Sequence, residues 1–256
     1  MLTAERVALG FVEAERQRRA SVPGAEVVEI DGLLLAFANV PDPPVNSTLV
    51  IFEPDDPRAA LARAEAEFRR RDRPFGIDVA RGRHPGVDRA IGSAGLSRLF
   101  SWPAMVMQVE ELPARALPEG VRVESVRDEE GGAAVGRVER ALLEPSEEDS
   151  EVPERFYAAA SYGVEDARTF VAWRDDAPVG IASAHLYERA VGLLGVGVIP
   201  AARRQGIASA LSVIAARTFA ADLVWLHASE MGRTLYTGLG FRRIADWEVW
   251  TRPDAR

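Results

Sequence analysis

The residues with the clearest chemical potential form the run RRQGIA at 203–208, between an apolar run at 191–199 and a helical pattern at 211–220. Amides at the start of a helix have no earlier carbonyl partner within the helix, and the helix dipole adds positive potential at that end. Gly206 lets an anion approach the backbone closely, and the two arginines add charge. This run therefore predicts a binding site for an anionic phosphate group. The alternative is an ordinary helix start whose arginines are solvated.

A second motif, ASEMGRTLYTGLGF, follows at 228–241. Ser229 is suited to cap the N-terminus of a helix, and Gly240 is suited to the position just after its C-terminus. Tyr236 falls near the end of that helix. It either packs against the core or donates a proton to a leaving group.

Together the two motifs resemble the GCN5-related N-acetyltransferase (GNAT) superfamily, over residues 121–256. RRQGIA matches the family's acyl-coenzyme A loop, R/Q-x-x-G-x-G/A, with Ala208 in the last position. The resemblance implies that the amides of 204–208 hold the pyrophosphate of coenzyme A, and that the strand ending at 197–199 hydrogen-bonds its pantetheine arm. It also implies that Tyr236 is the general acid for the coenzyme A thiolate. The cofactor-binding residues that it assigns are Gly197, Val198, Ile199, Arg203, Arg204, Gln205, Gly206, Ile207, Ala208 and Ser229.

Acetyl transfer to an amine also needs a base, because the attacking amine must be neutral. Many members of the superfamily carry a Glu on the strand before the loop, but 191–199 contains no carboxylate. The candidate bases are His227 and Glu188, with His185 and Glu230 as further candidates. His227 ends an expected strand, at the edge where ligands bind in α/β sheets. For each candidate, the alternative is a solvated or structural role.

The positions of proline and glycine indicate where the elements that position these residues begin and end. LPARALPEG at 112–120 disfavours a continuing helix or central strand, so we expect a domain at 1–112, a linker at 113–120 and a GNAT domain at 121–256. Hairpins in the middle of the chain and β-α-β units at its end predict a mixed α/β (α+β) sheet. The expected helices span 3–20, 57–71, 85–95, 128–143, 151–161, 203–220 and 229–239, and the expected strands span 26–30, 33–39, 48–53, 75–80, 104–110, 121–126, 168–174, 178–188, 190–199, 222–227 and 241–251.

The first 112 residues contain no second loop of this kind. The helix expected at 57–71 follows EPDDP at 53–57, whose carboxylates would repel a pyrophosphate. The order helix, strand, helix, strand nevertheless echoes the end of the chain. We interpret this half as a degenerate GNAT-like domain that has lost cofactor binding, which makes the chain a tandem member; an unrelated α/β domain is the alternative. In either case we expect it to shape the acceptor cleft or an interface.

The composition excludes several classes of binding partner. The chain has 256 residues, a formal net charge of -8 and no cysteine. An acidic protein is a poor partner for a nucleic-acid backbone, and the lack of cysteine excludes disulfides and thiolate metal sites. The three histidines lack zinc-site spacing, and no apolar run reaches the length of a membrane span. We expect a cytoplasmic protein without a metal, nucleic-acid or membrane partner, and we leave a homodimer open.

The acceptor is the least defined part of the prediction. The acidic segment EPSEEDSE at 144–151 is either a solvated loop or an attraction for a cationic amine. Phe156, Tyr157 and Tyr162 follow it, and they either line the acceptor cleft or pack.

We therefore expect an acetyl-CoA-dependent N-acetyltransferase that acts on a primary amine of an unidentified small molecule or protein. The alternative is a non-catalytic acyl-CoA-binding or sensing module, which the missing strand carboxylate favours and Tyr236 disfavours. A nucleotide-binding regulator ranks last, because the chain lacks the lysine of the GxxxxGK[ST] motif.

Overall fold

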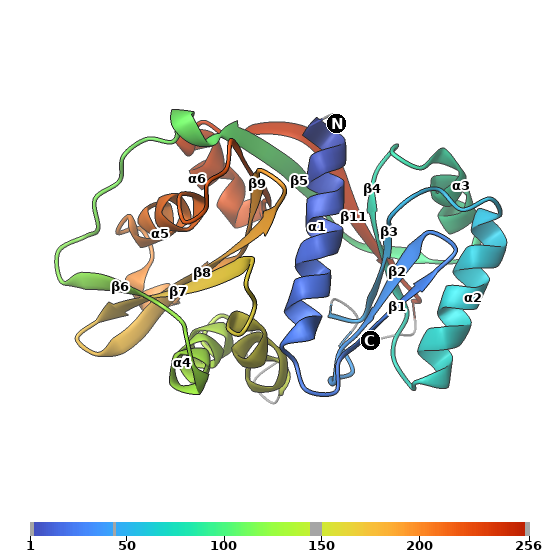
Figure 1. Ribbon diagram of the computed structural model, residues 1–256, viewed down its shortest axis with the longest axis horizontal. Helices are drawn as coiled ribbons and strands as arrows, with labels where there is room; N and C mark the ends of the chain where they lie inside the picture. The colour runs from blue at the N-terminus through green and yellow to red at the C-terminus, as the bar shows by residue number, and fades with distance from the viewer. Residues whose placement is uncertain (1–2, 43–44, 144–149, 254–256) are drawn as a thin grey trace.

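The protein is known from a computed structural model that describes residues 3–42, 45–143 and 150–253. The strands form one open 11-stranded mixed sheet with helices on its faces (Figure 1). The mixed α/β sheet expected from the sequence is therefore confirmed. Within the described ranges, no helix is both long and apolar enough to cross a membrane. The same ranges hold no group of three acidic or histidine side chains placed to bind a metal ion.

Two halves of the chain repeat one order of elements. The N-terminal half (residues 3–112) contains α1 (Thr3–Ala20), β1 (Glu26–Ile30), β2 (Leu33–Phe37), β3 (Ser47–Val50), α2 (Pro57–Arg70), β4 (Gly76–Ala80), α3 (Pro85–Ser93), β5 (Ser97–Gln108) and the short 3-10 helix η2 (Val109–Glu111). The C-terminal half (residues 121–253) contains β6 (Val121–Ser125), α4 (Glu129–Arg140), η4 (Pro153–Ala158), η5 (Ala159–Ser161), β7 (Ala167–Arg174), β8 (Ala177–Tyr187), β9 (Ala190–Val198), η6 (Pro200–Ala202), α5 (Ile207–Ala216), β10 (Leu223–His227), α6 (Glu230–Leu239) and β11 (Arg242–Thr251). In each half, two successive antiparallel pairings are followed by a parallel pair joined through a helix, then by a second helix and a final strand. The C-terminal half has one strand more, because β6 pairs antiparallel with β7.

Local chemistry explains most of the boundaries. Asp31 and Gly32 both have positive φ, 50° and 80°, which is the backbone of a two-residue hairpin turn between β1 and β2. Asp128 caps α4 by accepting a hydrogen bond from the Gly131 amide at 2.9 Å. Ser229 caps α6 in the same way, through the Gly232 amide at 3.1 Å.

Three expected elements differ most from the structure. The helix expected from 203 begins at Ile207, because Pro200–Ala202 form a 3-10 turn and Arg204 and Gly206 take left-handed conformations. The strand expected at 104–110 spans Ser97–Gln108. The helix expected at 151–161 is a π-helical turn followed by a 3-10 turn.

The two halves exchange their final strands. The sheet order is β1-β2-β3-β4-β11-β5-β10-β9-β8-β7-β6, so β5 of the N-terminal half lies between β11 and β10. It is antiparallel to both of them. Strand β11 of the C-terminal half lies in turn between β4 and β5. Each half therefore completes the sheet of the other, and the sheet is continuous across both.

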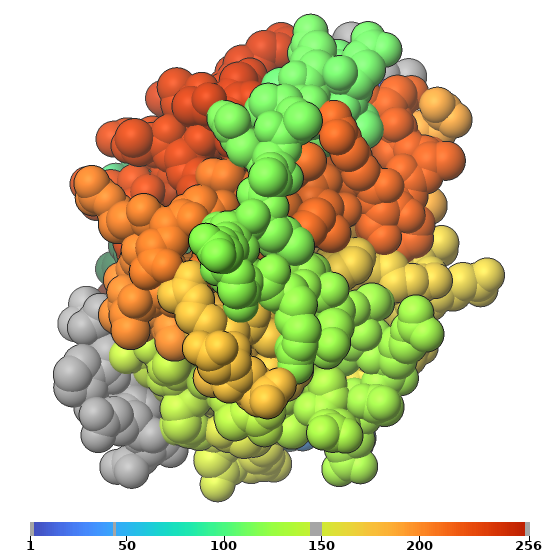
Figure 2. All heavy atoms as spheres, turned by 90° about the vertical axis from the view of Figure 1, so that its left-hand side faces the viewer, coloured from blue at the N-terminus to red at the C-terminus, as the bar shows by residue number. Residues whose placement is uncertain are grey.

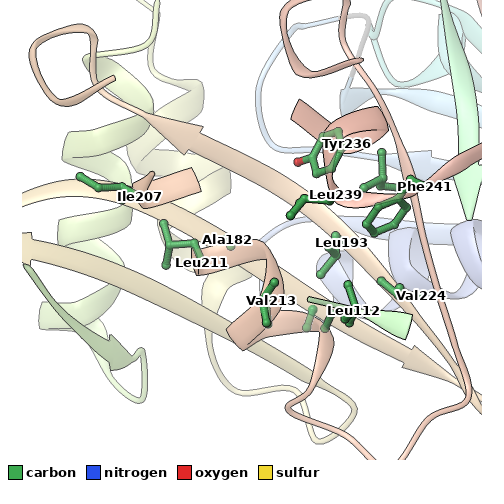
Figure 3. Packing of buried hydrophobic residues seen from close by; sticks show 14 of the residues in the cluster. Leu112, Ala182, Leu193, Ile207, Leu211, Val213, Val224, Tyr236, Leu239 and Phe241 are labelled. Atoms are coloured by element: carbon green, nitrogen blue, oxygen red, sulfur yellow. The ribbon is translucent and has the colours of Figure 1, made fainter. Parts of the chain in front are cut away.

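Helix α1 also joins the halves, because it crosses the middle of the sheet in front of both (Figure 1). It packs against β8 and β9 of the C-terminal half and β2 of the N-terminal half. Its Phe11 ring contacts Trp225 of β10 at a centroid distance of 6.2 Å and Trp247 of β11 at 5.0 Å. A large apolar core lies beside these three aromatic rings and contains Tyr236, Leu239 and Phe241 of the C-terminal half (Figure 3).

The connection between the halves, 112–120, runs along the outer surface of the C-terminal half (Figure 2). Residues 112–118 form neither helix nor strand. Arg217, which follows α5, donates a hydrogen bond to the Leu112 carbonyl oxygen at 2.7 Å. The connection is therefore fixed at its beginning to the helix that follows the predicted anion site.

Candidate active site

The two central parallel strands of the C-terminal half separate part-way along their length. Strands β9 and β10 pair from Ala190 and Leu223 as far as Leu193 and Leu226. Beyond this point β9 continues to Val198 against β8, with an irregular register around Gly195, whose φ is 58°. The predicted residues 197 and 198 lie on this separated stretch. An open strand edge presents unpaired amide and carbonyl groups, which suit an extended ligand.

The predicted anion site lies in the turn between β9 and α5. Gly206 precedes α5 with a φ of 85°, and no side chain caps this helix. Within the described part of the chain, none of the amides at 204–208 donates to a backbone carbonyl. A Cβ atom placed on Gly206 would meet nothing within 4 Å. The amides at 204–208 are therefore left without a backbone carbonyl partner at a helix N-terminus, and Gly206 borders open space, which is the geometry of an anion-binding turn.

The side chains of the loop divide into two groups. Arg203 donates from Nε to the Val198 carbonyl oxygen at 3.0 Å, and so it ties the loop to the end of β9. Arg204 is exposed and is available to an anion. Gln205 accepts a hydrogen bond from Arg174 of β7 at 2.7 Å, which brings a cation to the loop that sequence reasoning missed. Ile207 is buried in the core, and the Ala208 carbonyl accepts a hydrogen bond from the Ser212 hydroxyl at 2.8 Å.

The corresponding turn of the N-terminal half is filled by its own side chains. Asp56 caps α2 by accepting a hydrogen bond from the Ala59 amide at 3.0 Å, so a protein carboxylate lies at the helix N-terminus. Arg83 donates to the carbonyl oxygens of Val50 and Ile51, each at 3.2 Å, just where β3 leaves β4. A side chain of the protein therefore occupies the carbonyl groups at this end of β3.

Tyr236 lies on α6 with its ring edge-on to Phe241 at a centroid distance of 5.6 Å, and its hydroxyl points away from that ring (Figure 3). The residue is 7% exposed. Burial raises the pKa of its phenol to about 12, against a smaller lowering by a hydrogen bond with Ser212. The phenol is therefore protonated at neutral pH and can act as a proton donor. Ser229, at the start of the same helix, lines the same cavity as Tyr236.

The candidate bases differ in their surroundings. His227 lines this cavity, but burial lowers its pKa to about 3, and its ring stacks on Trp247 at a centroid distance of 4.6 Å. His185 is also in the cavity wall; burial lowers its pKa to about 3, and its Nδ1 lies 3.1 Å from Gln17 Oε1. Glu188 lies in the exposed turn between β8 and β9, outside the residues that line the cavity. Glu230 is likewise exposed, in the first turn of α6.

A carboxylate that sequence reasoning missed lies beside the stretch of β9 that has separated from β10. Glu139, on α4, lines the cavity, and its Oε1 is 3.7 Å from the position that a Cβ atom on Gly195 would take. Burial raises the pKa of Glu139 to about 7, against a smaller lowering by Arg18. A group with this pKa exchanges protons near neutral pH, as a general base must.

One cavity of about 350 Å³ is lined by Tyr236, His227 and Glu139 together. Its volume is within the range of small-molecule sites, roughly 300–1,000 Å³. Its walls come from both halves. The N-terminal half contributes Phe11, Glu15, Arg18, Asp78, Phe100 and Trp102, and the C-terminal half contributes Glu139, Tyr157, His185, His227, Ser229 and Tyr236. Of the aromatic residues expected near an acceptor, Tyr157 lies in the wall, Phe156 is buried, and Tyr162 packs on Gly132. Most of the acidic segment, 144–149, lies outside the described residues.

Comparison with known proteins agrees with this geometry. Residues 165–243 match the family model for the acetyltransferase (GNAT) domain. No curated protein matches the chain. The chain therefore contains a GNAT acetyltransferase domain, as the two sequence motifs indicated.

Solved structures extend the likeness to nearly the whole chain. A GCN5-related N-acetyltransferase from Kribbella flavida is 18% identical, with a TM-score of 0.75 over 99% of this chain and 96% of that one. A conserved protein of unknown function from Staphylococcus epidermidis is 15% identical, with a TM-score of 0.66 over 90% of this chain and 95% of that one. A tandem GNAT protein from the clavulanic acid biosynthesis pathway is 18% identical, with a TM-score of 0.61 over 90% and 83%. The chain as a whole has the GNAT fold, in a form that a tandem member shares.

Proposed function

We propose that the protein is an acetyl-CoA-dependent N-acetyltransferase that transfers an acetyl group to a primary amine. The observation that carries this proposal is that one cavity joins the open edge of β9, the protonated phenol of Tyr236 and the half-buried carboxyl group of Glu139. A proton donor and a proton acceptor thus line the same cavity as the open stretch of β9.

The residues present fit coenzyme A. The amides at 204–208, together with Arg204, would hold its pyrophosphate, and the backbone of the separated stretch of β9, with the adjoining Ile199, would hold its pantetheine arm. We assign cofactor binding to the C-terminal domain, residues 121–256. Residues 1–112 form a degenerate GNAT-like domain, because Asp56 and Arg83 occupy the corresponding positions.

The reaction then needs proton transfers at the acceptor nitrogen and at the departing sulfur. Glu139 accepts a proton from the ammonium form of the acceptor, and the neutral amine nitrogen then forms a bond to the carbonyl carbon of the thioester. The carbon–sulfur bond breaks, Tyr236 donates its proton to the departing sulfur, and the proton that the new amide nitrogen loses restores the phenol. Glu139 is a better base than His227, because a group with a pKa of about 3 holds a proton too weakly to take one from an ammonium ion. Glu188, in its exposed turn, is the weakest of the sequence candidates.

The second candidate function is a non-catalytic acyl-CoA sensor, which the lack of a carboxylate on β9 favours. Calorimetry with coenzyme A and a thiol-release assay with acetyl-CoA and a panel of amines separate the two. We expect one coenzyme A site per chain and thiol release that depends on an amine. Binding without thiol release for any amine would favour the sensor, and no binding would overturn both functions.

A further inference from the structure

A single row of residues runs across three strands of both halves, on the side of the sheet that faces α1. Asp78 of β4 pairs in register with Val249 of β11, and Val249 pairs with Phe100 of β5. The next row on the same side contains Trp247 and its partner Trp102. Asp78, Val249, Phe100 and Trp102 all line the cavity. The strand exchange thus contributes one part of the lining of the cavity that also holds Tyr236 and Glu139.

Asp78 is the polar group of this wall whose interactions are incomplete. It is 6% exposed. Its side chain interacts with the Ser47 hydroxyl, and burial together with the negative charge of Glu15 raises its pKa well above the ordinary value, while its Oδ1 has no partner in hydrogen-bond geometry among the described residues. The nearby arginines are already engaged. Glu15 forms ion pairs with Arg18, at 2.6 Å, and with Arg19, and Arg19 also donates to the Val45 carbonyl oxygen. A buried carboxyl oxygen without a partner is costly, which points to a ligand that supplies one.

The remainder of the wall is flat and apolar. The rings of Phe100 and Trp102 stack at a centroid distance of 4.2 Å with an interplanar angle of 21°. Phe11 of α1 lines the cavity as well. Such a surface accepts a planar apolar group. An anionic group is disfavoured here, because it would lie beside Asp78 while Arg18 and Arg19 are both paired with Glu15.

We propose that Asp78, Phe100 and Trp102 form an acceptor subsite, and that the acceptor is a primary amine on a flat apolar body whose far end carries a second, cationic hydrogen-bond donor. This inference rests on the proposed function, since it assigns the acceptor of that reaction. The far donor binds Asp78, the flat body lies along Phe100 and Trp102, and the reacting amine points toward Glu139.

Three para-substituted benzylamines test the subsite. They are para-xylylenediamine, with a distal ammonium group, para-methylbenzylamine, with a distal methyl group, and para-(aminomethyl)benzoate, with a distal carboxylate. For the wild-type protein we expect kcat/KM for the diamine to exceed that for the methyl compound by about 10- to 100-fold, the ratio that a hydrogen bond between charged groups supplies. The benzoate should be the poorest of the three.

The variant Asp78→Asn keeps the shape of the side chain and should reduce the advantage of the diamine to within about twofold. Asp176→Asn, in an exposed turn, is the matched control and should leave the ratio unchanged. The thermal shift with coenzyme A, which should match that of the wild type, shows whether each variant is folded. If Asp78→Asn does not fold, the order of the kcat/KM values of the three amines with the wild-type protein still tests the subsite.

A binding measurement separates this inference from the proposed function. Tryptophan fluorescence of the coenzyme A complex is titrated with each amine. Acetylation with equal use of diamine and methyl compound, or a diamine advantage that survives Asp78→Asn, overturns the subsite and leaves the function standing. Diamine binding that needs Asp78, without acetylation of any amine, supports the subsite and overturns the function. Absence of both binding and acetylation overturns both.

Discussion

Trp102 of β5 pairs in register with Trp247 of β11 at the centre of the sheet, and each belongs to the last strand of a different half. Strand β5 also pairs with β10, and β11 also pairs with β4. The two halves are therefore joined by backbone hydrogen bonds over the length of their final strands, and not only by the segment at 113–120. Neither half contains a complete sheet without the other.

This arrangement predicts the behaviour of separated halves. A fragment of residues 113–256 lacks β5, so the edges of β10 and β11 and the apolar face beneath α1 would be exposed to solvent. We expect this fragment to aggregate when it is produced alone. Produced together, the fragments 1–112 and 113–256 should form a stable 1:1 complex that binds coenzyme A. Size-exclusion chromatography with calorimetry measures both properties, and a monomeric, cooperatively folded 113–256 fragment would contradict the prediction.

The sequence predicted the elements better than their pairing. The apolar runs on both sides of the Asp31-Gly32 turn located β1 and β2, and the cap at Ser229 located α6. The exchange of β5 and β11 could not be predicted, because a central strand has the same apolar pattern whichever neighbours it pairs with. The late start of α5 had a visible cause in Pro200, but the left-handed conformation of Arg204 depends on the whole turn.

The loop at 203–208 is tested by Gly206→Glu. The new carboxylate would lie against the pyrophosphate, so we expect the stabilisation by coenzyme A to be lost. In the wild type, a ligand that binds only the folded state at a hundredfold excess over Kd contributes roughly 2.7 kcal/mol. Thermal unfolding with and without coenzyme A measures the difference.

Backbone strain needs its own control, because Gly206 has a left-handed φ of 85°. Gly120 has a φ of 72° and is also in open space, but it lies in the segment between the halves. Gly120→Glu should lower the melting temperature by a similar amount and keep the full coenzyme A shift. A full shift in Gly206→Glu would show that the loop does not bind the cofactor.

Tyr236→Phe tests the proton donor. Phe preserves the ring contact with Phe241, so the fold and the affinity for coenzyme A should be nearly unchanged. Turnover should fall by roughly 10²–10⁴-fold, the usual contribution of general acid catalysis. Tyr187→Phe, at the end of β8 and outside the cavity lining, is the control. Thiol release at saturating substrates gives turnover, and a wild-type rate in Tyr236→Phe would remove this residue from the mechanism.

The rest of the site was beyond sequence reasoning for a physical reason. A Glu near the end of an amphipathic helix, as at 139, is most often solvated, and an Asp between Ile77 and Val79 carries no signal of a ligand. Their surroundings are supplied by elements distant in the sequence, because Arg18 of α1 lies near Glu139 and Val249 of the exchanged strand β11 pairs with Asp78. Tyr236 was accessible to sequence reasoning because it belongs to a local motif.

Glu139→Gln makes a prediction for both activity and stability. A base must be deprotonated to act. Wild-type kcat/KM should therefore be low at acidic pH and should increase as the pH rises through the pKa of Glu139, about 7. The variant should lose roughly 10²–10⁴-fold in turnover and lack this titration. Glu130→Gln, on the exposed first turn of the same helix, should keep the wild-type profile.

The effect on stability has the opposite sign. The folded pKa of Glu139, about 7, exceeds its ordinary value of 4.5, so the unfolded chain releases this proton first as the pH rises. Ionisation therefore costs stability between pH 4.5 and 7, and the full cost remains above that window. Because Gln does not ionise, Glu139→Gln should be more stable than the wild type at pH 8 by about 1–3 kcal/mol, with the advantage shrinking toward pH 5. Urea unfolding at both pH values measures it, and an equal effect at both would mean that Glu139 is solvated and not the half-buried base.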